Sequence, residues 1–264
     1  VAAVFDAAFG AELMLKSYTE HIKNGGVDCL ISQQCPTIVN YLEIYQPQLL
    51  DYLPPVDSAT VHTIKMIKEF YGQYQAHEVI VISPCLSRKR ELEETGWGDY
   101  NVTFKSIRDH FENSSQTLFQ YPEQEFATPD PERAALVSKP GGLLEAARRD
   151  LEEVENSGRQ ISAVEQVYDY LAELEESIEH GFNPLLVDCL SCELGCNGGP
   201  GADFSDKTRD ELEFAVNQRS QKLKAKYKGN EGSLTSFFNN NSLAKEVKQK
   251  WKSGLYTREY IDLS

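Results

Sequence analysis

Six cysteines occur in the 264-residue chain, and most of them stand in a pattern that could bind metal. Cys35 comes directly before a proline, and Cys85 comes directly after one. The third group is Cys189, Cys192 and Cys196. Thiolates are ligands for zinc ions and for iron–sulfur clusters, so the three groups together predict a metal or cluster site.

The third group has the spacing Cys-x2-Cys-x3-Cys and runs into Gly198, Gly199 and Gly201. Glycines allow backbone N–H groups to approach a cluster closely. A structural zinc site is the alternative, but it usually adds a second Cys-x2-Cys pair or histidines. The five histidines do not stand at ligand spacings: His21, His62, His77, His110 and His180. Ligation by thiolates alone from three distant segments therefore favours iron–sulfur over zinc.

Each cysteine group follows a predicted strand. The strands are expected at 27–31, 79–82 and 184–188, with a further strand at 100–104. Helices are expected at 7–24, 37–48, 58–74, 106–112, 143–151, 162–179 and 207–227, with a loop over 114–133. This alternation predicts an α/β protein with parallel sheets, in which ligand sites collect at the carboxyl ends of strands.

The local sequence also predicts properties of two thiols and one strand. Pro36 suits the first position of a helix, so Cys35 should lie at a helix N-terminus, where the dipole favours thiolate. Basic residues after Cys85 are expected to lower its pKa. Residues 79–82 are all β-branched and do not alternate with polar residues, which predicts burial on both faces of the sheet.

Composition excludes several classes of protein. Apolar residues make up 41% and charged residues 25%, as in a folded globular protein. The net charge of −15 argues against a nucleic-acid partner, and no apolar run is long enough to span a membrane. Six cysteines are too few for a disulfide scaffold. No signal peptide is visible, so we expect a cytoplasmic protein, and the missing initial Met predicts a piece of a longer chain.

Three segments in this order resemble the catalytic, cluster-binding domain of iron-only ([FeFe]) hydrogenases. The family's Thr-Ser-Cys-Cys-Pro is similar to residues 32–36, Ser-Gln-Gln-Cys-Pro. Its Met-Pro-Cys-x-x-Lys-x-x-Glu is similar to residues 83–91, and its Met-Ala-Cys-Pro-Gly-Gly-Cys is similar to residues 190–196. Weaker matches at 5–12 and 140–147 extend the resemblance over residues 1–205.

The resemblance implies a fold and a cofactor. It implies two lobes, each with a small, mostly parallel sheet flanked by helices, and a cluster at the interface between the lobes. Residues 1–205 would form this domain, and residues 206–264 would be its C-terminal helical extension. The implied ligands of a [4Fe–4S] cluster are Cys35, Cys85, Cys192 and Cys196. In the family, the residue that matches Cys196 also bridges to a two-iron subcluster with CO and cyanide ligands.

Other positions depart from the family pattern. The proton-delivering cysteine of the family is Gln34 here, and an amide has no titrating proton near neutral pH. Two family acids in the first helix fall on Ser17 and Tyr18, and the pocket methionines fall on Ser83 and Leu190.

Two positions in the second motif keep their charge. Arg88 replaces a lysine that hydrogen-bonds a cyanide ligand in the family, and Glu91 is retained. Arginine keeps the charge of lysine but presents a planar fork of donors. With the thiolates kept and the proton path interrupted, the pattern is similar to the sensory branch of the family, which implies hydrogen or redox sensing with slow or absent turnover of H2 and protons.

That branch implies partners as well: a ferredoxin-like electron donor upstream and PAS, kinase or phosphatase modules downstream. The closing segment 256–260 fits a domain excised from such a chain. Two cysteines remain. Cys29 is expected in the core, whereas Cys189 is open as a packed thiol, an alternative ligand or a replacement proton donor. Two other functions also stay open: an electron-transfer or assembly-type protein with only the [4Fe–4S] cluster, and a true hydrogenase with proton delivery through Cys189.

Overall fold

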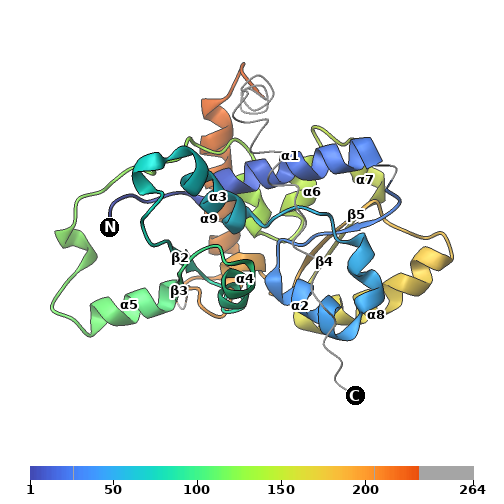
Figure 1. Cartoon of the computed structure of the whole chain (residues 1–264), viewed down its shortest axis with the longest axis horizontal. Helices are drawn as coiled ribbons and strands as arrows, with labels where there is room; N and C mark the ends of the chain where they lie inside the picture. The colour runs from blue at the N-terminus through green and yellow to red at the C-terminus, as the bar shows by residue number, and fades with distance from the viewer. Residues whose placement is uncertain (26, 205, 232–264) are drawn as a thin grey trace.

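The computed structural model describes residues 1–25, 27–204 and 206–231, and Figure 1 traces the chain through them. The predicted closing segment 256–260 lies outside the described residues. The α-helices are α1 (Ala7–Gly25), α2 (Pro36–Tyr45), α3 (Ala59–Phe70), α4 (Arg88–Thr95), α5 (Phe104–Glu112), α6 (Gly142–Ala147), α7 (Val154–Ser157), α8 (Val164–Glu179) and α9 (Arg209–Lys226). Short 3-10 helices are η1 (Pro47–Tyr52), η2 (Gly72–Tyr74), η3 (Leu118–Gln120), η4 (Ala134–Ser138) and η5 (Gly195–Gly198).

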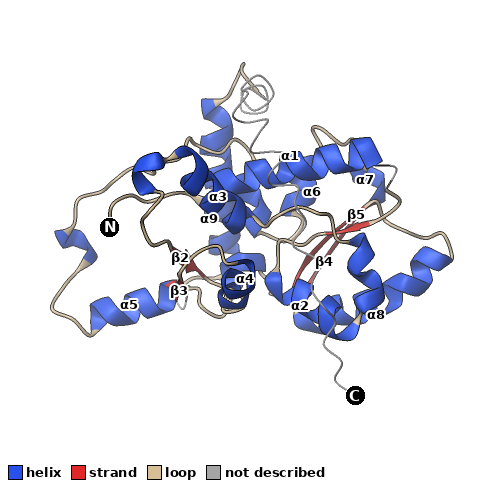
Figure 2. Cartoon of the chain, viewed as in Figure 1, coloured by secondary structure: helices blue, strands red, loops and turns tan. Residues whose placement is uncertain are grey.

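Two small parallel sheets organise these helices. Sheet A has the strand order β1 (Leu30–Ile31), β5 (Leu186–Leu190) and β4 (Gly158–Ser162). Sheet B pairs β2 (Ile80–Ser83) with β3 (Tyr100–Thr103). Figure 2 shows the two sheets apart from each other, each with helices around it. The predicted α/β class with small parallel sheets flanked by helices is confirmed.

Sheet A is covered on both faces because its central strand alternates between two apolar clusters. Leu30 and Leu186 pack into a cluster with residues of α1 and α6. Ile31 and Val187 pack into a second cluster with residues of α2 and α8. The packing of these two clusters holds β1 and β5 in place, and both strands lead into loops that contain cysteines.

One strand is missed by the sequence analysis, and one expectation about another strand is wrong. The sequence predicts no strand at β4, because Gly158–Ser162 contains few strand-favouring residues; its pairing with β5 decides its conformation. Residues 79–82 are not buried on both faces, since Ile80 and Ile82 are 56% and 48% exposed. Sheet B has two strands in the described part of the chain, and no described helix covers this face.

Helices α1 and α3 pack against each other over a long contact. Gly10 lies at the crossing, where an added Cβ would be 2.2 Å from the carbonyl oxygen of Ala59. Helix α3 begins after Ser58, whose side chain accepts the N–H of Val61 as an N-cap. None of the helices in the described residues combines the length and apolar character needed to span a bilayer.

Glu12 on α1 organises the entry to η4. Its Oε1 atom accepts the backbone N–H groups of Glu132, Arg133 and Ala134 at 2.8, 2.5 and 2.7 Å. Burial raises the pKa of Glu12, while the N–H groups of Ala134 and Arg133 act in the opposite direction. The carboxylate therefore pairs three donors that would otherwise be buried without partners.

We predict that Glu12→Ala lowers the free energy of unfolding by about 2–3 kcal/mol at neutral pH. Alanine removes the acceptor and leaves three backbone N–H groups without this partner in a buried position. Urea denaturation measures the change. Glu173→Ala, at an exposed position on α8, is the matched control and should change stability by less than about 0.5 kcal/mol. Equal losses in the two variants would contradict this role of Glu12.

Candidate functional site

Cys35 lies at the junction between β1 and α2. It is the N-cap residue of α2, with Pro36 at the first helical position, as the sequence predicts. Its carbonyl oxygen accepts the N–H groups of Ile38 and Val39 at 3.0 and 3.2 Å. The Cys35 side chain is buried at the positive end of the helix dipole.

Cys85 lies in the loop between β2 and α4. The side chain of Ser83 accepts the N–H of Cys85 at 3.3 Å, and Asn101 on β3 donates to the carbonyl oxygen of Cys85 at 2.9 Å. Helix α4 begins only at Arg88, three residues after the cysteine. The neighbouring strand therefore holds the backbone of Cys85.

Cys192 and Cys196 follow β5 in a tight loop that includes η5. Gly195 adopts φ +63°, and an added Cβ there would lie 2.4 Å from the carbonyl oxygen of Ser138. The loop thus needs a glycine for its conformation and for its close approach to the chain before α6.

Hydrogen bonds join the three cysteine segments. The N–H of Gly201, after the third group, donates to the carbonyl oxygen of Pro84 at 2.9 Å. Arg88 donates from Nη2 to the carbonyl oxygen of Gln34 at 3.3 Å. The hydroxyl of Thr37 donates to Ser87 at 2.8 Å. Segments that are distant in sequence therefore meet between sheets A and B.

The four thiols lie close enough to influence one another electrostatically. Burial is the main cause that raises the pKa of Cys85, of Cys192 to about 11 and of Cys196 to about 12, and negative charge on Cys35 raises all three further. Arg88 lowers the pKa of Cys85, but burial outweighs it, so the predicted decrease is wrong. Thiolates in this site need a compensating cation, which an iron–sulfur cluster supplies; the donor set fits such a group.

Among the described residues, no group of three or more Cys, His, Asp or Glu side chains is arranged to hold a metal ion. In a four-iron cluster each thiolate binds a different iron atom, so the four thiols surround the cluster without converging on one point.

Arg88 is a buried cation beside this site. It pairs through Nη1 with Glu91 and donates to the hydroxyl of Ser58 at 3.0 Å. Burial alone would lower its pKa, but the charges of Glu91 and of the thiolates raise it above the usual value. Within the described chain, the buried Nε of Arg88 has no hydrogen-bond partner. The N–H at Nε of Arg88 is therefore available to a hydrogen-bond acceptor that is not part of the described chain.

Gln34 is buried and held in place by Asp188. Its Nε2 donates to Asp188 Oδ1 at 3.0 Å, and the other oxygen of Asp188 accepts the N–H of Leu143 at 3.0 Å. Burial raises the pKa of Asp188 to about 7. The sequence analysis missed Asp188; the signal was a single acid within the apolar run 185–190 that precedes the cysteine group.

The other positions that depart from the family pattern make local contacts. Ser17 donates to the carbonyl oxygen of Leu13 on its own helix at 3.0 Å. The hydroxyl of Tyr18 donates to the side chain of Gln33 at 3.0 Å and accepts its backbone N–H at 2.9 Å. Ser83 donates to Asn101 at 2.9 Å, and Leu190 is buried in the core. None of these four side chains carries a carboxylate or a thiol.

The structure places Cys189 and Cys29 in the core. Cys189, whose role the sequence leaves open, is buried within β5, where its Sγ is 3.6 Å from the hydroxyl of Ser32. Burial raises the pKa of Cys189 well above the usual value. Cys29 is buried just before β1, as predicted, and burial raises its pKa to about 12.

Fold and site together define an α/β protein with four thiols in the loops that follow strands β1, β2 and β5 of its two parallel sheets. The sequence model of the family described as "Iron only hydrogenase large subunit, C-terminal domain" matches residues 1–200. The chain therefore belongs to this family of iron–sulfur, H-cluster-type domains. No curated protein matches the sequence.

Solved [FeFe]-hydrogenase structures share the fold. A structure that describes oxygen inactivation through the 2Fe subcluster is 15% identical, with a TM-score of 0.64 over 93% of this chain and 83% of that one. A HydA1 variant from Chlamydomonas reinhardtii is 15% identical, with a TM-score of 0.61 over 99% and 82%. HydA(deltaEFG), described for stepwise H-cluster assembly, is 17% identical, with a TM-score of 0.59 over 84% and 74%.

We predict that Asp188→Asn weakens the dependence of stability on pH. The folded pKa is about 7 and the unfolded value is about 4, so between these values the unfolded chain releases a proton that the folded chain keeps. Stability from this group is therefore lost as pH rises from about 4 to about 7, by up to a few kcal/mol. Urea denaturation across this window, compared with the variant, measures the contribution.

Asp169→Asn, at an exposed position on α8, is the matched control for Asp188→Asn. It should leave the shape of the pH profile unchanged. If the Asp188 variant and the parent chain lose stability in parallel across the window, Asp188 is ionised in the folded state throughout and the argument fails.

Proposed function

We propose that this chain binds a [4Fe–4S] cluster through Cys35, Cys85, Cys192 and Cys196 and acts as a hydrogen or redox sensor with little or no H2 turnover. The observation that carries the proposal is the contrast within one site. Four thiols from three segments are kept and interact, whereas the position beside Cys35 carries Gln34, whose amide is tied to Asp188. The site keeps its donors for iron but not a titrating group at the relay position.

The surroundings of the thiols support a cluster. Pro84, Gly201, Gln34 and Arg88 tie the three segments together by hydrogen bonds. A bound cluster would supply electron transfer and, with a two-iron subcluster that bears CO and cyanide, hydrogen activation as in the family. Cys196 matches the bridging position. The unpartnered Nε of Arg88 supports a role as donor to a ligand such as cyanide, with Glu91 orienting the guanidinium group.

The proton side of the site supports slow turnover. Gln34 has no titrating proton near neutral pH, and Ser17 and Tyr18 are engaged in hydrogen bonds with Leu13 and Gln33. Protons therefore lack the acid–base groups that accelerate transfer in this family. Electrons and a small gas can still reach a site that protons enter slowly, which suits detection better than catalysis.

Two other functions remain as alternatives. A protein with only the [4Fe–4S] cluster would serve electron transfer or assembly. A true hydrogenase would need Cys189 as proton donor; its sulfur lies beside Ser32 and its pKa is raised, so it would release a proton poorly near neutral pH. We favour the sensor because Arg88 keeps a donor without a partner in the described chain, which a four-iron cluster alone does not require.

The remaining parts of the proposal concern the setting of the domain. We propose a ferredoxin-like module or protein as electron donor, a PAS, kinase or phosphatase module as the downstream partner, and a cytoplasmic location. Residues 1–205 would form the cluster-binding domain, with 206–264 as its helical extension. Helix α9 lies in this extension and packs against η4.

We predict that replacing any one of Cys35, Cys85, Cys192 or Cys196 by alanine removes most of the bound iron and sulfide. Loss of one thiolate leaves an open coordination position in a buried site. Iron and acid-labile sulfide analysis of the reconstituted protein measures the change. Cys29→Ala is the matched control, because Cys29 is a buried thiol of the core, and it should keep full cluster content. A Cys29 variant that loses iron as the others do would refute the ligand assignment.

We predict that Gln34→Cys raises H2 turnover in protein that shows infrared bands of CO and cyanide. A well-placed acid or base contributes about 10²–10⁴-fold to rate, and the gain should fall near the lower end because Ser17 and Tyr18 still interrupt the path. Gln34→Ser, which adds no acid of suitable pKa, is the control. Hydrogen uptake assays and infrared spectra on the same samples measure both properties.

The outcomes separate the proposed function from its alternatives. High turnover in the parent chain that Cys189→Ala abolishes would establish the true hydrogenase. Infrared spectra without CO and cyanide bands after maturation would establish the [4Fe–4S]-only protein. Intact bands with turnover unchanged by Gln34→Cys would show that proton delivery does not limit this chain.

A further inference from the structure

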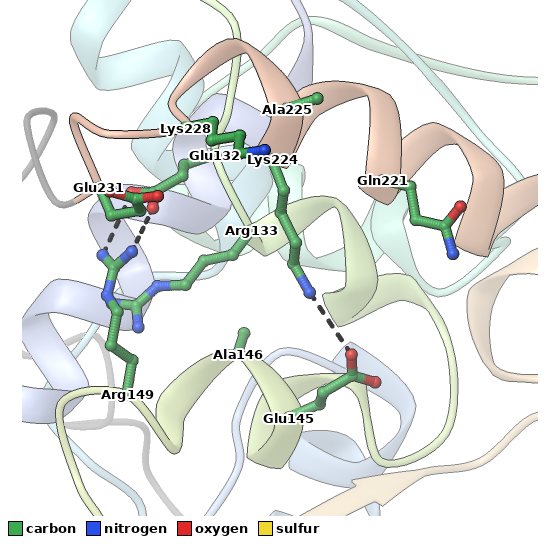
Figure 3. A pocket seen from close by; sticks show the side chains of 10 residues that line it. All are labelled: Glu132, Arg133, Glu145, Ala146, Arg149, Gln221, Lys224, Ala225, Lys228 and Glu231. Atoms are coloured by element: carbon green, nitrogen blue, oxygen red, sulfur yellow. Dashed lines mark hydrogen bonds and ion pairs between the residues drawn. The ribbon is translucent and has the colours of Figure 1, made fainter.

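A cavity of about 480 Å³ lies between the C-terminal part of the described chain and the region around α6. One wall comes from the second half of α9 and the residues just after it. The other wall comes from Glu132, Arg133, Glu145, Ala146 and Arg149 (Figure 3). None of the cysteines or of their hydrogen-bonded neighbours lines it. The cavity is therefore separate from the proposed cluster site.

The lining is rich in cations although the chain as a whole is acidic. Arg133, Arg149, Lys224 and Lys228 line the cavity together with three glutamates. Asp150 beside the cavity pairs with Arg133 and lies 3.7 Å from Arg149, so the four positive charges meet four negative ones. Four cations at one cavity are still a concentration of positive charge in a chain with a net charge of −15. The two lysines belong to the basic segment 221–252, which holds eight lysines and two glutamates and has no role in the proposed cluster site.

Arg133 is the cation whose hydrogen bonds are incomplete. Its side chain is only 7% exposed, and it pairs through Nη2 with Asp150. Within the described chain, neither its Nε nor its Nη1 has a hydrogen-bond partner. Figure 3 shows the guanidinium group of Arg133 beside that of Arg149, at the end of the cavity away from Gln221. Asp150 already joins the two guanidinium groups, but it accepts only from Nη2 of Arg133. The buried Nε and Nη1 donors are unfavourable without a further acceptor.

The other cations of the lining have acidic neighbours. Arg149 pairs with Glu132, where one N–H···O distance is 3.1 Å, and Lys224 lies 3.5 Å from Glu145. Lys228, two residues after the end of α9, lines the same cavity. An oxyanion bound to the open donors of Arg133 would thus lie among cations from both walls, and it would tie α9 to the body of the fold.

We propose that this cavity binds a phosphate oxyanion, either free phosphate or the phosphate group of a small molecule such as a nucleotide. Arginine and lysine together are the usual partners of phosphate, since guanidinium groups present several directed donors and ammonium groups add charge. The volume is in the range of small-molecule sites and exceeds what one phosphate ion fills. The proposal does not depend on the cluster.

Titration calorimetry with inorganic phosphate and with a nucleoside diphosphate, at matched ionic strength, tests the site. Saturable binding of phosphate alone supports a free ion as ligand. Tighter binding of the nucleotide supports a phosphorylated small molecule, because the rest of the cavity then adds contacts. Absence of saturable binding for both probes would overturn the proposal.

Three variants locate the binding. Arg133→Met should weaken it about tenfold or more, since it removes charged donors from a buried position. Lys228→Gln should weaken it about threefold, as expected for a more exposed charge. Arg219→Gln is the matched control: it removes one positive charge from α9, but Arg219 pairs with Asp6 outside the cavity. Its affinity should equal that of the parent chain.

Hydrogen exchange gives an independent readout. Bound phosphate should increase the protection of backbone amides in the second half of α9, while the exchange of α8 stays constant. If Arg133→Met does not fold, Lys228→Gln and Arg219→Gln still decide the matter. Equal loss of affinity in those two variants, or unchanged exchange in α9 at saturating ligand, would overturn the proposal.

Discussion

Four thiols from the ends of three parallel strands must meet in a site that excludes most water, and the rest of the structure depends on this constraint. Burial and mutual charge raise the pKa of Cys192 to about 11 and of Cys196 to about 12, so the chain alone holds these groups as neutral thiols. Their deprotonation requires a cation at the same place. Hydrogen bonds from backbone, hydroxyl and guanidinium groups accordingly join the cysteine loops to one another, and apolar clusters pack against the strands that precede them.

Two buried carboxyl groups, Glu12 and Asp188, support the loops of the site from outside the set of four thiols. Glu12 on α1 accepts the backbone N–H of Ala134 at the start of η4. The carbonyl oxygen of Ser138, at the end of η4, lies close to Gly195. Asp188 holds Gln34 on one side and the start of α6 on the other. A carboxylate buried in this way is costly unless every oxygen is paired, so these contacts specify one arrangement of the loops.

The two sides of the site have different chemical capacities. The thiol side keeps every group that iron requires, and Arg88 adds a buried cation with a donor that no described residue uses. The proton side presents an amide, a serine and a tyrosine that are occupied by local hydrogen bonds. The proposed sensing function rests on this contrast. The asymmetry follows from side-chain identity and not from a change of fold, since the chain superposes on [FeFe]-hydrogenase structures at low identity.

The sequence alone determined the features that depend on local chemistry. Strand residues followed by cysteine placed Cys35, Cys85 and Cys192 at strand ends, and Pro36 predicted the helix that begins after Cys35. The order of the three motifs identified the family. These predictions succeeded because turn residues, proline and hydrophobic periodicity act over a few positions along the chain.

Only the tertiary structure decided features that depend on neighbours distant in sequence. Strand β4 forms because β5 pairs with it, and Cys189 lies in the core because β5 continues through it. Ile80 is exposed because no described helix covers its face of sheet B. The pKa of Cys85 is raised, against the local expectation, because burial by other segments outweighs the nearby charge of Arg88. Desolvation and strand pairing are properties of the packed molecule, so no local pattern of residues reports them.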